Sequence, residues 1–360
     1  MPPIPPSIQL PPTDQFRPFD LGEVIERFDI RLRGGQLENY RPAPLGFPQI
    51  DDCLGGGLRA EDLVLIGGMQ NVGKTILALQ IARNLAIAGQ VLPIVVCYEH
   101  SPEALLHRLI CMESVPDLAA PEPAGGVTRA EIETAVLEYY AQVHAPAERE
   151  SLGLQWLLKR LPGAERAWYR MKRYLSRLWL VRGDGLETTD EKLAEYVRMA
   201  QMLGFHRAAL IVDYAQRVPL RPALSLSLGG LALNEVQRID LVMRGLKGIA
   251  QQFGIPVLAV AAADAEGLRR QRIHFEDLWG TSVTQYEPDA ALILNRDTLE
   301  AEGGTRTVRL AIEKNRSGPS EVEFRHRLHG AYYCLSAQGE PVNIDVSFQA
   351  ERLHFRHPID

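Results

Sequence analysis

One glycine-rich stretch decides the fold, and it reads Gly68-Met69-Gln70-Asn71-Val72-Gly73-Lys74-Thr75. Its spacing is G-x4-G-K-[ST]. The apolar run Asp62–Gly67 precedes it, and the helical pattern Lys74–Ala88 follows it. Glycines allow successive backbone N–H groups to point at phosphate oxygens, and the positive end of the following helix dipole adds to this attraction. In this context the stretch is interpreted as a phosphate-binding loop rather than an ordinary glycine-rich turn.

The loop predicts a nucleotide and a metal ion as cofactors. Lys74 is expected to reach the β- and γ-phosphates, and the Thr75 hydroxyl is expected to ligate Mg²⁺. The residues expected to bind ATP here are Gly68, Met69, Gln70, Asn71, Val72, Gly73, Lys74 and Thr75. ATP and Mg²⁺ are therefore the predicted cofactors.

Two acidic residues follow apolar runs further along the chain. Asp213 ends Ala208–Asp213, where a carboxylate at the C-terminal edge of a buried strand can hold Mg²⁺. Glu99 follows the run Val91–Tyr98 and precedes a helix start at Ser101. A carboxylate there can polarise the water that attacks the γ-phosphate. The alternative for Glu99 is a solvated loop carboxylate.

Apolar runs alternate with helical patterns through most of the chain. The strand-like runs are Asp62–Gly67, Val91–Tyr98, Leu178–Arg182, Ala208–Asp213, Pro256–Ala261 and Ala290–Leu294. The helical segments are Lys74–Ala88, Ser101–Cys111, Asp190–Leu203 and Asn234–Phe253. The sequence predicts an α/β fold, a P-loop NTPase with a mostly parallel central sheet covered by helices; that the fold is RecA-like is implied by the resemblance described below. A C-terminal antiparallel extension is expected from the runs Thr305–Lys314, Glu321–Leu328 and Ala331–Leu335.

The expected ATPase core spans residues 45–335 and is preceded by two different segments. Residues 1–20 are rich in proline and predict a disordered or extended arm. Residues 21–44 hold an amphipathic helix, Leu21–Leu32, and a connection to the core. The apolar side of this helix is expected to pack either on its own domain or on a neighbouring subunit.

Residues 112–177 are longer than a minimal α/β connection requires, and predict a surface insertion. Helical patterns cover Thr128–Val143 and Glu165–Arg177, the second of which is rich in Arg and Lys. Residues 336–360 are expected to form a C-terminal tail.

Composition limits the class of protein. The net charge of −6 argues against a surface that is basic throughout, although it permits basic loops in a channel. No apolar run of about 18 residues predicts a membrane span, and no secretory signal is visible at the N-terminus. The four cysteines lack metal-binding spacing and are expected to be buried free thiols in a reducing cytoplasm.

Several motifs in the same order resemble the RecA-like ATPase (C-terminal) domain of DnaB-type hexameric replicative helicases, with KaiC-like and RadA-like ATPases as the next resemblance. The segments that carry the resemblance are Leu45–Asp51, Leu54–Leu58, the P-loop, Tyr98–Ser101, Ile211–Gln216, Asn234–Phe253 and Lys314–Pro319. Their order along one chain makes chance similarity improbable.

The resemblance implies a homo-oligomeric ring, a hexamer, with ATP bound between subunits. It implies that Gln216 belongs to the nucleotide site and that Lys314 and Arg316 complete the site of the neighbouring subunit. Alternation along the expected strand puts Lys314 and Arg316 on one face. The alternative for these two cations is surface charge on a hairpin.

The resemblance also implies loops that line a central channel, near Arg217–Gly229 and Glu266–His274. The candidate nucleic-acid contacts in them are Arg217, Arg221, Arg269, Arg270 and Arg272. The last three are expected to form a compact cluster that grips phosphates, or else a solvated loop.

This chain departs from the family pattern in two places. Where the family carries an N-terminal helical domain that contacts primase, only the proline-rich arm and one helix are expected before the core in this sequence. A Ser-Gln sensor after the strand Pro256–Val260 is replaced by Ala261-Ala262, neither of which can form a side-chain hydrogen bond. The second change puts the coupling of ATP hydrolysis to DNA movement in doubt.

Three functions follow from these motifs. The first is a DnaB-helicase-like ring ATPase that hydrolyses ATP and binds or translocates on single-stranded DNA, without membrane contact. The second is a KaiC-like ring ATPase that acts as a nucleotide switch for protein partners without unwinding. The third, a scaffold that binds nucleotide without turnover, is least consistent with Lys74, Glu99 and Asp213. Stimulation of ATPase activity by DNA separates the three.

Overall fold

The computed structural model describes residues 18–35, 37–117, 125–142, 153–221, 233–264, 267–278, 285–300 and 306–342. The chain divides into two compact units, Met1–Arg41 and Pro42–Asp360. In the first unit the predicted helix is present as α1 (Leu21–Arg33), and a short 3₁₀ turn, η2 (Glu38–Tyr40), follows it. Asp20 caps α1 by accepting a hydrogen bond from the backbone N–H of Glu23 at 2.8 Å. Most of the predicted proline-rich arm, residues 1–17, lies outside the described residues.

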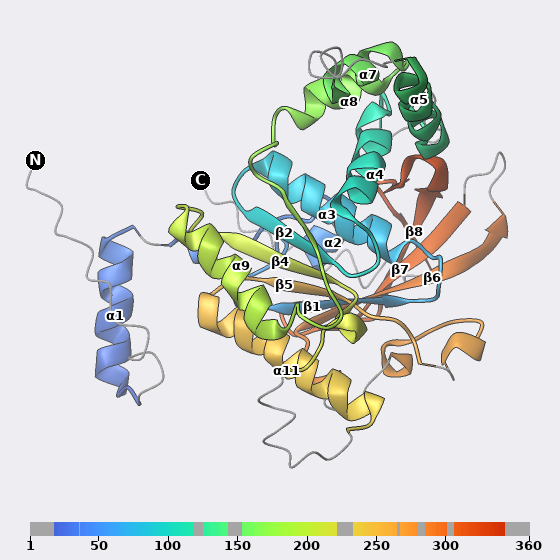
Figure 1. Ribbon diagram of the computed structural model, residues 1–360. Coiled ribbons are helices and arrows are strands. Elements are labelled where there is room, and N and C mark those ends of the chain that lie inside the picture. The colour runs from blue at the N-terminus through green and yellow to red at the C-terminus, as the bar shows by residue number, and fades with distance from the viewer. Residues whose placement is uncertain are drawn as a thin grey trace, which may run out of the picture. The chain divides into compact units, whose positions relative to one another are not determined.

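The second unit is built on one large sheet, as predicted (Figure 1). Its strands are β1 (Leu63–Gly68), β2 (Leu92–Cys97), β3 (Trp179–Arg182), β4 (Ala208–Asp213), β5 (Val257–Val260), β6 (Ala290–Glu300), β7 (Arg306–Asn315), β8 (Val322–His329), β9 (Cys334–Leu335) and β10 (Glu340–Pro341). The strand order is β10-β8-β7-β6-β1-β5-β4-β2-β3, and β9 pairs with β8. Strands β6 to β3 in this order are parallel, whereas β7 to β10 add the antiparallel extension.

Helices cover both faces of the parallel part (Figure 1). Helices α3 (Lys74–Ala88) and α4 (Pro102–Ser114) lie on one face, and α9 (Asp190–Met202) and α11 (Glu235–Phe253) lie on the other. Alternate side chains of β1 belong to different cores: Val64 and Ile66 face the first layer, and Leu63 and Leu65 face the second. This two-sided burial explains why the strands are continuously apolar.

A short helix, α2 (Pro48–Cys53), closes the connection into the core. The Asp51 carboxylate accepts hydrogen bonds from the backbone N–H groups of Leu45, Gly46 and Phe47 at 2.6, 3.0 and 3.1 Å. Burial raises the pKa of Asp51 to about 6, although these bonds oppose the shift. The bonds hold Leu45–Asp51, one of the segments that resemble the DnaB-type family, in a fixed turn.

The insertion contains α5 (Arg129–Gln142), α7 (Leu154–Arg160) and α8 (Ala164–Met171). The helix predicted over Glu165–Arg177 ends early, at Met171. After it, backbone bonds from Tyr174 to Met171 and from Arg177 to Tyr174 make tighter three-residue turns. The sequence did not predict α7.

Four further 3₁₀ turns carry loop residues: η3 (Ala215–Arg217), η4 (Gly267–Arg269), η5 (Phe275–Asp277) and η7 (Gly330–Tyr332). All four cysteines are free and buried, as expected. Within the described ranges, no helix combines the length and apolarity that a membrane crossing needs.

Candidate nucleotide site

The phosphate-binding loop connects β1 to α3, as the spacing predicts. Gly68 has φ of +145°, and a Cβ there would lie 2.3 Å from the carbonyl oxygen of Leu294. Gly73, with φ of +104°, is the N-cap of α3. Both positions therefore require glycine, one because the neighbouring strand is too close and the other because of its left-handed backbone. The loop ends at a helix N-terminus, where backbone N–H groups attract anions.

Lys74 is folded back onto the loop and is only 4% exposed. Its Nζ donates hydrogen bonds to the carbonyl oxygens of Gly68 and Met69 at 2.9 and 2.7 Å. Burial lowers the pKa of Lys74 to about 8, while the charges of Asp213 and Glu99 oppose this shift. A phosphate would give this buried ammonium an anionic partner in place of two neutral carbonyls.

Asp213 lies where a magnesium ion would need it. It is opposite Cys97 in the β2–β4 ladder, and the Cys97 Sγ lies 3.7 Å from its Oδ2. Burial raises the pKa of Asp213 to about 6, and the nearby Thr75 hydroxyl opposes this shift. Among the described residues, nothing hydrogen-bonds the buried Oδ1 of Asp213. A buried carboxylate oxygen without a partner, beside a hydroxyl, fits a hydrated Mg²⁺ ion held by Thr75 and Asp213.

Glu99 follows β2 and is exposed at the same edge of the sheet. Its negative charge raises the pKa values of Lys74, Asp213 and Tyr214, so its carboxylate lies within electrostatic reach of all three. Lys74, Asp213 and Glu99 are therefore brought together, and the Glu99 carboxylate is open to solvent.

Gln216 connects the nucleotide site to the end of β5, where Ala261-Ala262 stand in place of the family's Ser-Gln sensor. Its Nε2 donates to the carbonyl oxygen of Ala262 at 3.2 Å, and its buried Oε1 has no hydrogen-bond donor among the described residues. Arg238 holds the same turn by donating to the carbonyl oxygens of Gln216 and Val218 at 2.5 and 3.0 Å. The backbone of Ala262 thus accepts a contact that its side chain cannot make.

Lys314 and Arg316 lie at the opposite edge of the sheet from the P-loop. Lys314 pairs with Ala291 near the start of β6, and the backbone N–H of Arg316 donates to the carbonyl oxygen of Asp289 at 2.9 Å. Leu63, the first residue of β1, exchanges hydrogen bonds with the same Asp289. Arg316 is thus level with the start of β1, whose six residues span about 20 Å. Lys314 is level with Leu65, halfway along β1, but its side chain is held toward residues that precede β6. Neither cation therefore reaches the P-loop of its own subunit.

Both cations have partners within their own chain. Lys314 Nζ donates to the carbonyl oxygens of Gln285 and Tyr286 at 2.5 and 3.1 Å. Arg316 pairs with the Asp289 carboxylate at 3.0 Å and donates to Tyr286 at 2.5 Å. Asp289 also pairs with Lys247 at 2.7 Å. Sequence reasoning missed Asp289 and Cys97, because each acts through a partner in another strand or loop.

The two candidate arginines after β4 differ in their surroundings. Arg217 ends η3 and is exposed. Arg221 forms ion pairs with Asp190 at 2.5 Å and with Glu191 at 3.1 Å, so a phosphate would have to displace these carboxylates. Most of the expected channel loop lies beyond Arg221, outside the described residues.

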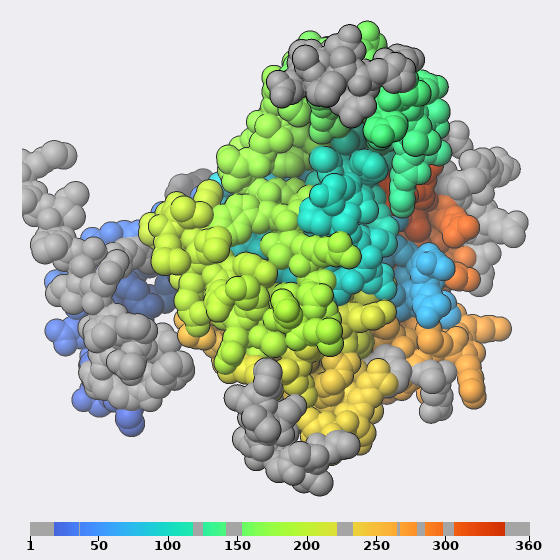
Figure 2. Space-filling model, in the orientation of Figure 1, coloured from blue at the N-terminus to red at the C-terminus, as the bar shows by residue number. Residues whose placement is uncertain are grey.

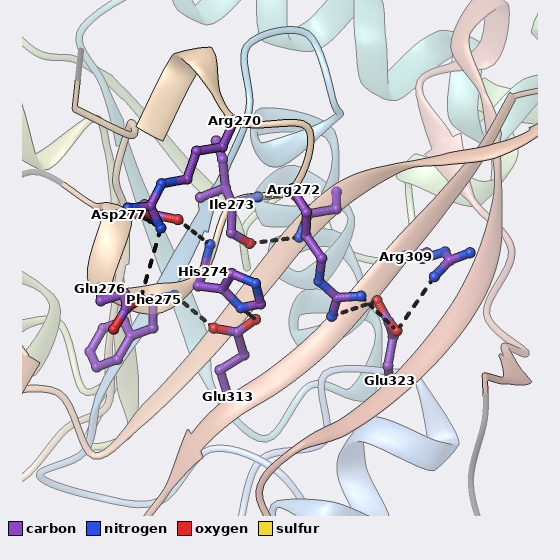
Figure 3. Close-up of polar contacts among 11 residues, drawn as sticks. Arg270, Arg272, Ile273, His274, Phe275, Glu276, Asp277, Arg309, Glu313 and Glu323 are labelled. Atoms are coloured by element: carbon purple, nitrogen blue, oxygen red, sulfur yellow. Dashed lines mark hydrogen bonds and ion pairs between the residues drawn. The ribbon is translucent and has the colours of Figure 1, made fainter. Parts of the chain in front are cut away.

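The candidate arginines after β5 do not share one partner (Figure 3). Arg270 points to Asp277, at 2.8 Å, and Arg272 points to Glu323 on β8, at 3.1 Å. Arg269 is exposed at the end of η4 and has no ion pair within the described part of the chain. Nearby, Glu313 accepts a hydrogen bond from the backbone N–H of Phe275 at 2.7 Å, which fixes the loop to β7.

The chain is similar to known proteins over this core. Residues 43–136 match the family described as DnaB-like helicase C terminal domain. The replicative DNA helicase DnaB of Treponema pallidum is 24% identical over 285 residues, which cover 76% of this chain and 52% of that protein. The DnaB of Geobacillus stearothermophilus is 22% identical over 304 residues, with 82% and 57% covered. The chain thus spans about half the length of these relatives.

Two solved structures share the fold. One is an isolated ATPase domain, with a TM-score of 0.63 at 18% identity, and with 91% of this chain and 100% of that chain covered. The other is a DnaB-like replicative helicase, solved in a study of its interactions with primase, with a TM-score of 0.61 at 18% identity and with 83% and 63% covered. In fold and motif order, the chain resembles the RecA-like ATPase (C-terminal) domain of DnaB-type replicative helicases.

Proposed function

We propose that this chain is a DnaB-helicase-like ring ATPase that hydrolyses MgATP and binds or translocates on single-stranded DNA. The observation that carries the proposal is the gathering of Lys74, Asp213 and Glu99 at one edge of the sheet, around a helix N-terminus. The relatives are replicative DNA helicases, which favours this function over a KaiC-like switch. A cytoplasmic site of action is part of the proposal, because these relatives are replicative proteins of bacteria.

In the proposed reaction, Lys74 leaves the carbonyls of Gly68 and Met69 and binds the β- and γ-phosphate oxygens. Thr75 and Asp213 would hold Mg²⁺, which when bound neutralises charge on the phosphates. Glu99 orients a water molecule and accepts its proton as the oxygen attacks the γ-phosphorus, while the bond from this phosphorus to the β,γ-bridging oxygen breaks and ADP leaves. The exposure of Glu99 leaves room for this water.

The separation of Lys314 and Arg316 from their own P-loop supports sites shared between subunits. Cations held on the side of the sheet away from the P-loop can serve a γ-phosphate only if it belongs to another copy of the chain. A head-to-tail ring places Lys314 and Arg316 of one subunit against the P-loop of the next subunit at every interface. We therefore propose a homo-oligomer, a hexamer, in which Lys314 and Arg316 stabilise the charge of the neighbour's transition state.

The proposed DNA contacts lie on two turns after neighbouring strands, β4 and β5. Exposed Arg217 and Arg269 can meet phosphates directly, whereas Arg221, Arg270 and Arg272 must first leave their carboxylates. The pair Ala261-Ala262 favours the alternative, a nucleotide switch. Neither side chain can form a hydrogen bond, so neither can couple the bound nucleotide to the turns that would contact DNA.

The test is steady-state ATPase activity with and without single-stranded DNA. We expect single-stranded DNA to bind and to raise turnover only weakly, because Ala261-Ala262 lack the side-chain relay. Glu99→Gln should reduce turnover by about 10²-fold while nucleotide binding persists, because only the general base is lost. Unchanged turnover in Glu99→Gln would remove Glu99 from the mechanism. A well-formed ring that hydrolyses ATP but binds no single strand at low salt would leave the switch function instead.

A further inference from the structure

The last part of the insertion, residues 154–177, carries a charge opposite to that of the whole protein. Residues 154–177 contain seven basic side chains and a single acidic one, Glu165, in a chain with a net charge of −6. The basic residues are Lys159, Arg160, Arg166, Arg170, Lys172, Arg173 and Arg177. Such a local reversal of sign attracts polyanions even when the whole molecule is acidic.

Two of these arginines are fixed by the C-terminal end of α4. Arg166 Nη1 donates to the carbonyl oxygen of Ser114 at 2.6 Å. Arg170 donates to the carbonyl oxygens of Glu113, Val115 and Pro116 at 3.0, 2.5 and 2.7 Å. Carbonyls at a helix C-terminus lack partners within the helix, and cations there are favourable. The bonds hold both guanidinium groups in place, and within the described residues only Nη1 of Arg166 is engaged.

The fixed arginines border an open hollow of about 590 Å³. Its lining residues are Gly163, Glu165, Arg166, Tyr169, Arg170 and Arg173. Tyr169 is 54% exposed, so its ring is open to a ligand, and Lys172 Nζ lies 5.7 Å from its centroid. An exposed aromatic ring among cations is the arrangement by which proteins bind single strands, with bases stacked on the ring and phosphates on the cations.

The hollow is distinct from the nucleotide site. Helix α4 begins three residues after Glu99 and runs for 13 residues, about 20 Å, and the other helices of the insertion follow its end. Figure 1 shows α5, α7 and α8 gathered beyond its far end, and Figure 2 shows them as a lobe that stands out from the sheet-containing body. A single-stranded nucleic acid bound in the hollow would not touch the P-loop of the same subunit.

We propose that this hollow is an accessory binding site for single-stranded nucleic acid, in which a base stacks on Tyr169 and phosphates contact Arg166 and Arg173. The choice of nucleic acid among polyanions rests on the proposed function. The site itself rests on the charge, the fixed arginines and the exposed ring. It gives the insertion a role that the ATPase core does not need for hydrolysis.

The experiment is fluorescence anisotropy of a labelled oligothymidine with the full-length chain, titrated at several salt concentrations. Tyr169→Ala should weaken binding by about fivefold or more, whereas Tyr169→Phe, which keeps the ring, should bind like wild type. Arg173→Gln should reduce the slope of log affinity against log salt by about 0.7, the value for one single-strand phosphate. Arg198→Gln removes the same charge from the exposed surface of α9 and should leave the slope unchanged.

The outcomes separate this site from the proposed function. If the wild type binds the oligonucleotide but Tyr169→Ala and Arg173→Gln bind it equally well, the accessory site is wrong and the proposed function stands. If Tyr169→Phe loses as much affinity as Tyr169→Ala, stacking is wrong. If the wild type hydrolyses ATP yet binds no oligonucleotide, both DNA proposals fail. Basal ATPase activity should stay unchanged in all three variants of the hollow, and melting temperatures check that they remain folded.

Discussion

Complementation between two inactive variants tests whether sites are shared between subunits. Glu99→Gln removes the general base beside the P-loop, and Arg316→Ala removes the guanidinium group at the opposite edge of the sheet. Each variant alone should be nearly inactive, because every interface then lacks one of the two groups. The strand β1 sets about 20 Å between the two edges, which is far more than an arginine side chain can reach, so no subunit can repair its own site.

Mixing the two variants should restore activity at a defined level. In a ring with equal and random mixing, about a quarter of interfaces join a subunit with intact Glu99 to a neighbour with intact Arg316. If the sites hydrolyse ATP independently, turnover should be about a quarter of the wild-type value. If hydrolysis must proceed from one site to the next around the ring, turnover should be lower. Either value exceeds the residual turnover of the separate variants.

The assay is steady-state ATP hydrolysis after the subunits have exchanged, with exchange followed by energy transfer between labelled chains. A mixture of Glu99→Gln with Lys74→Ala is the matched control. Both changes damage the P-loop side of an interface, so no combination of these subunits makes an intact site. If mixing Glu99→Gln with Arg316→Ala restores no ATPase activity although the subunits have exchanged, Arg316 does not act in the site of a neighbouring subunit.

Three other changes have defined outcomes. Because burial lowers the pKa of free Lys74 to about 8 and a bound phosphate requires the ammonium, nucleotide binding should take up about one proton at pH 9 and weaken as pH rises above 8. Calorimetry in buffers of different ionisation enthalpy measures this uptake, and Lys74→Arg, which stays charged, should show none; a pH-independent wild-type affinity would contradict the shift. Lys74→Ala should lose nucleotide affinity in the same calorimeter, since the backbone loop alone leaves the β- and γ-phosphate charge uncompensated. Removal of residues 1–33 should lower the oligomer fraction in light scattering and leave the remaining chain folded, because α1 exposes Leu21 and Ile25 by 74% and 59%. An unchanged oligomer would show that α1 does not contribute to assembly.

Local signals predicted the elements around the nucleotide. The helical pattern after the P-loop predicts Lys74–Ala88, and the structure confirms these limits, with left-handed Gly73 and Gly89 on either side. Strand β6 was predicted to end at Leu294 but continues to Glu300, since its outer half is held by the hairpin partner β7, as in the pairing of Arg296 with Val308. That support comes from pairing between strands rather than from apolar sequence.

The contacts of the arginines could not be predicted in the same way. Arg270 and Arg272 are two residues apart, yet they pair with Asp277 and with Glu323, which lies on a different strand. A cluster of charges in sequence predicts positive potential, but the partners depend on which acidic residues the fold brings near. The same holds for Cys97, whose contact with Asp213 follows from the register of β2 against β4.

The double burial of β1 leaves a problem of alignment. Most strands are aligned by the contrast between an apolar and a polar face, but β1 is apolar on both, so sliding it by one residue would cost little hydrophobic free energy. Two specific contacts remove this freedom. At the start, the Asp289 carboxylate accepts a hydrogen bond from the N–H of Leu63 at 2.8 Å, and at the end only a glycine fits against Leu294. The height of the phosphate-binding loop above the sheet is thus set partly by a carboxylate at the opposite edge, the same one that Arg316 holds.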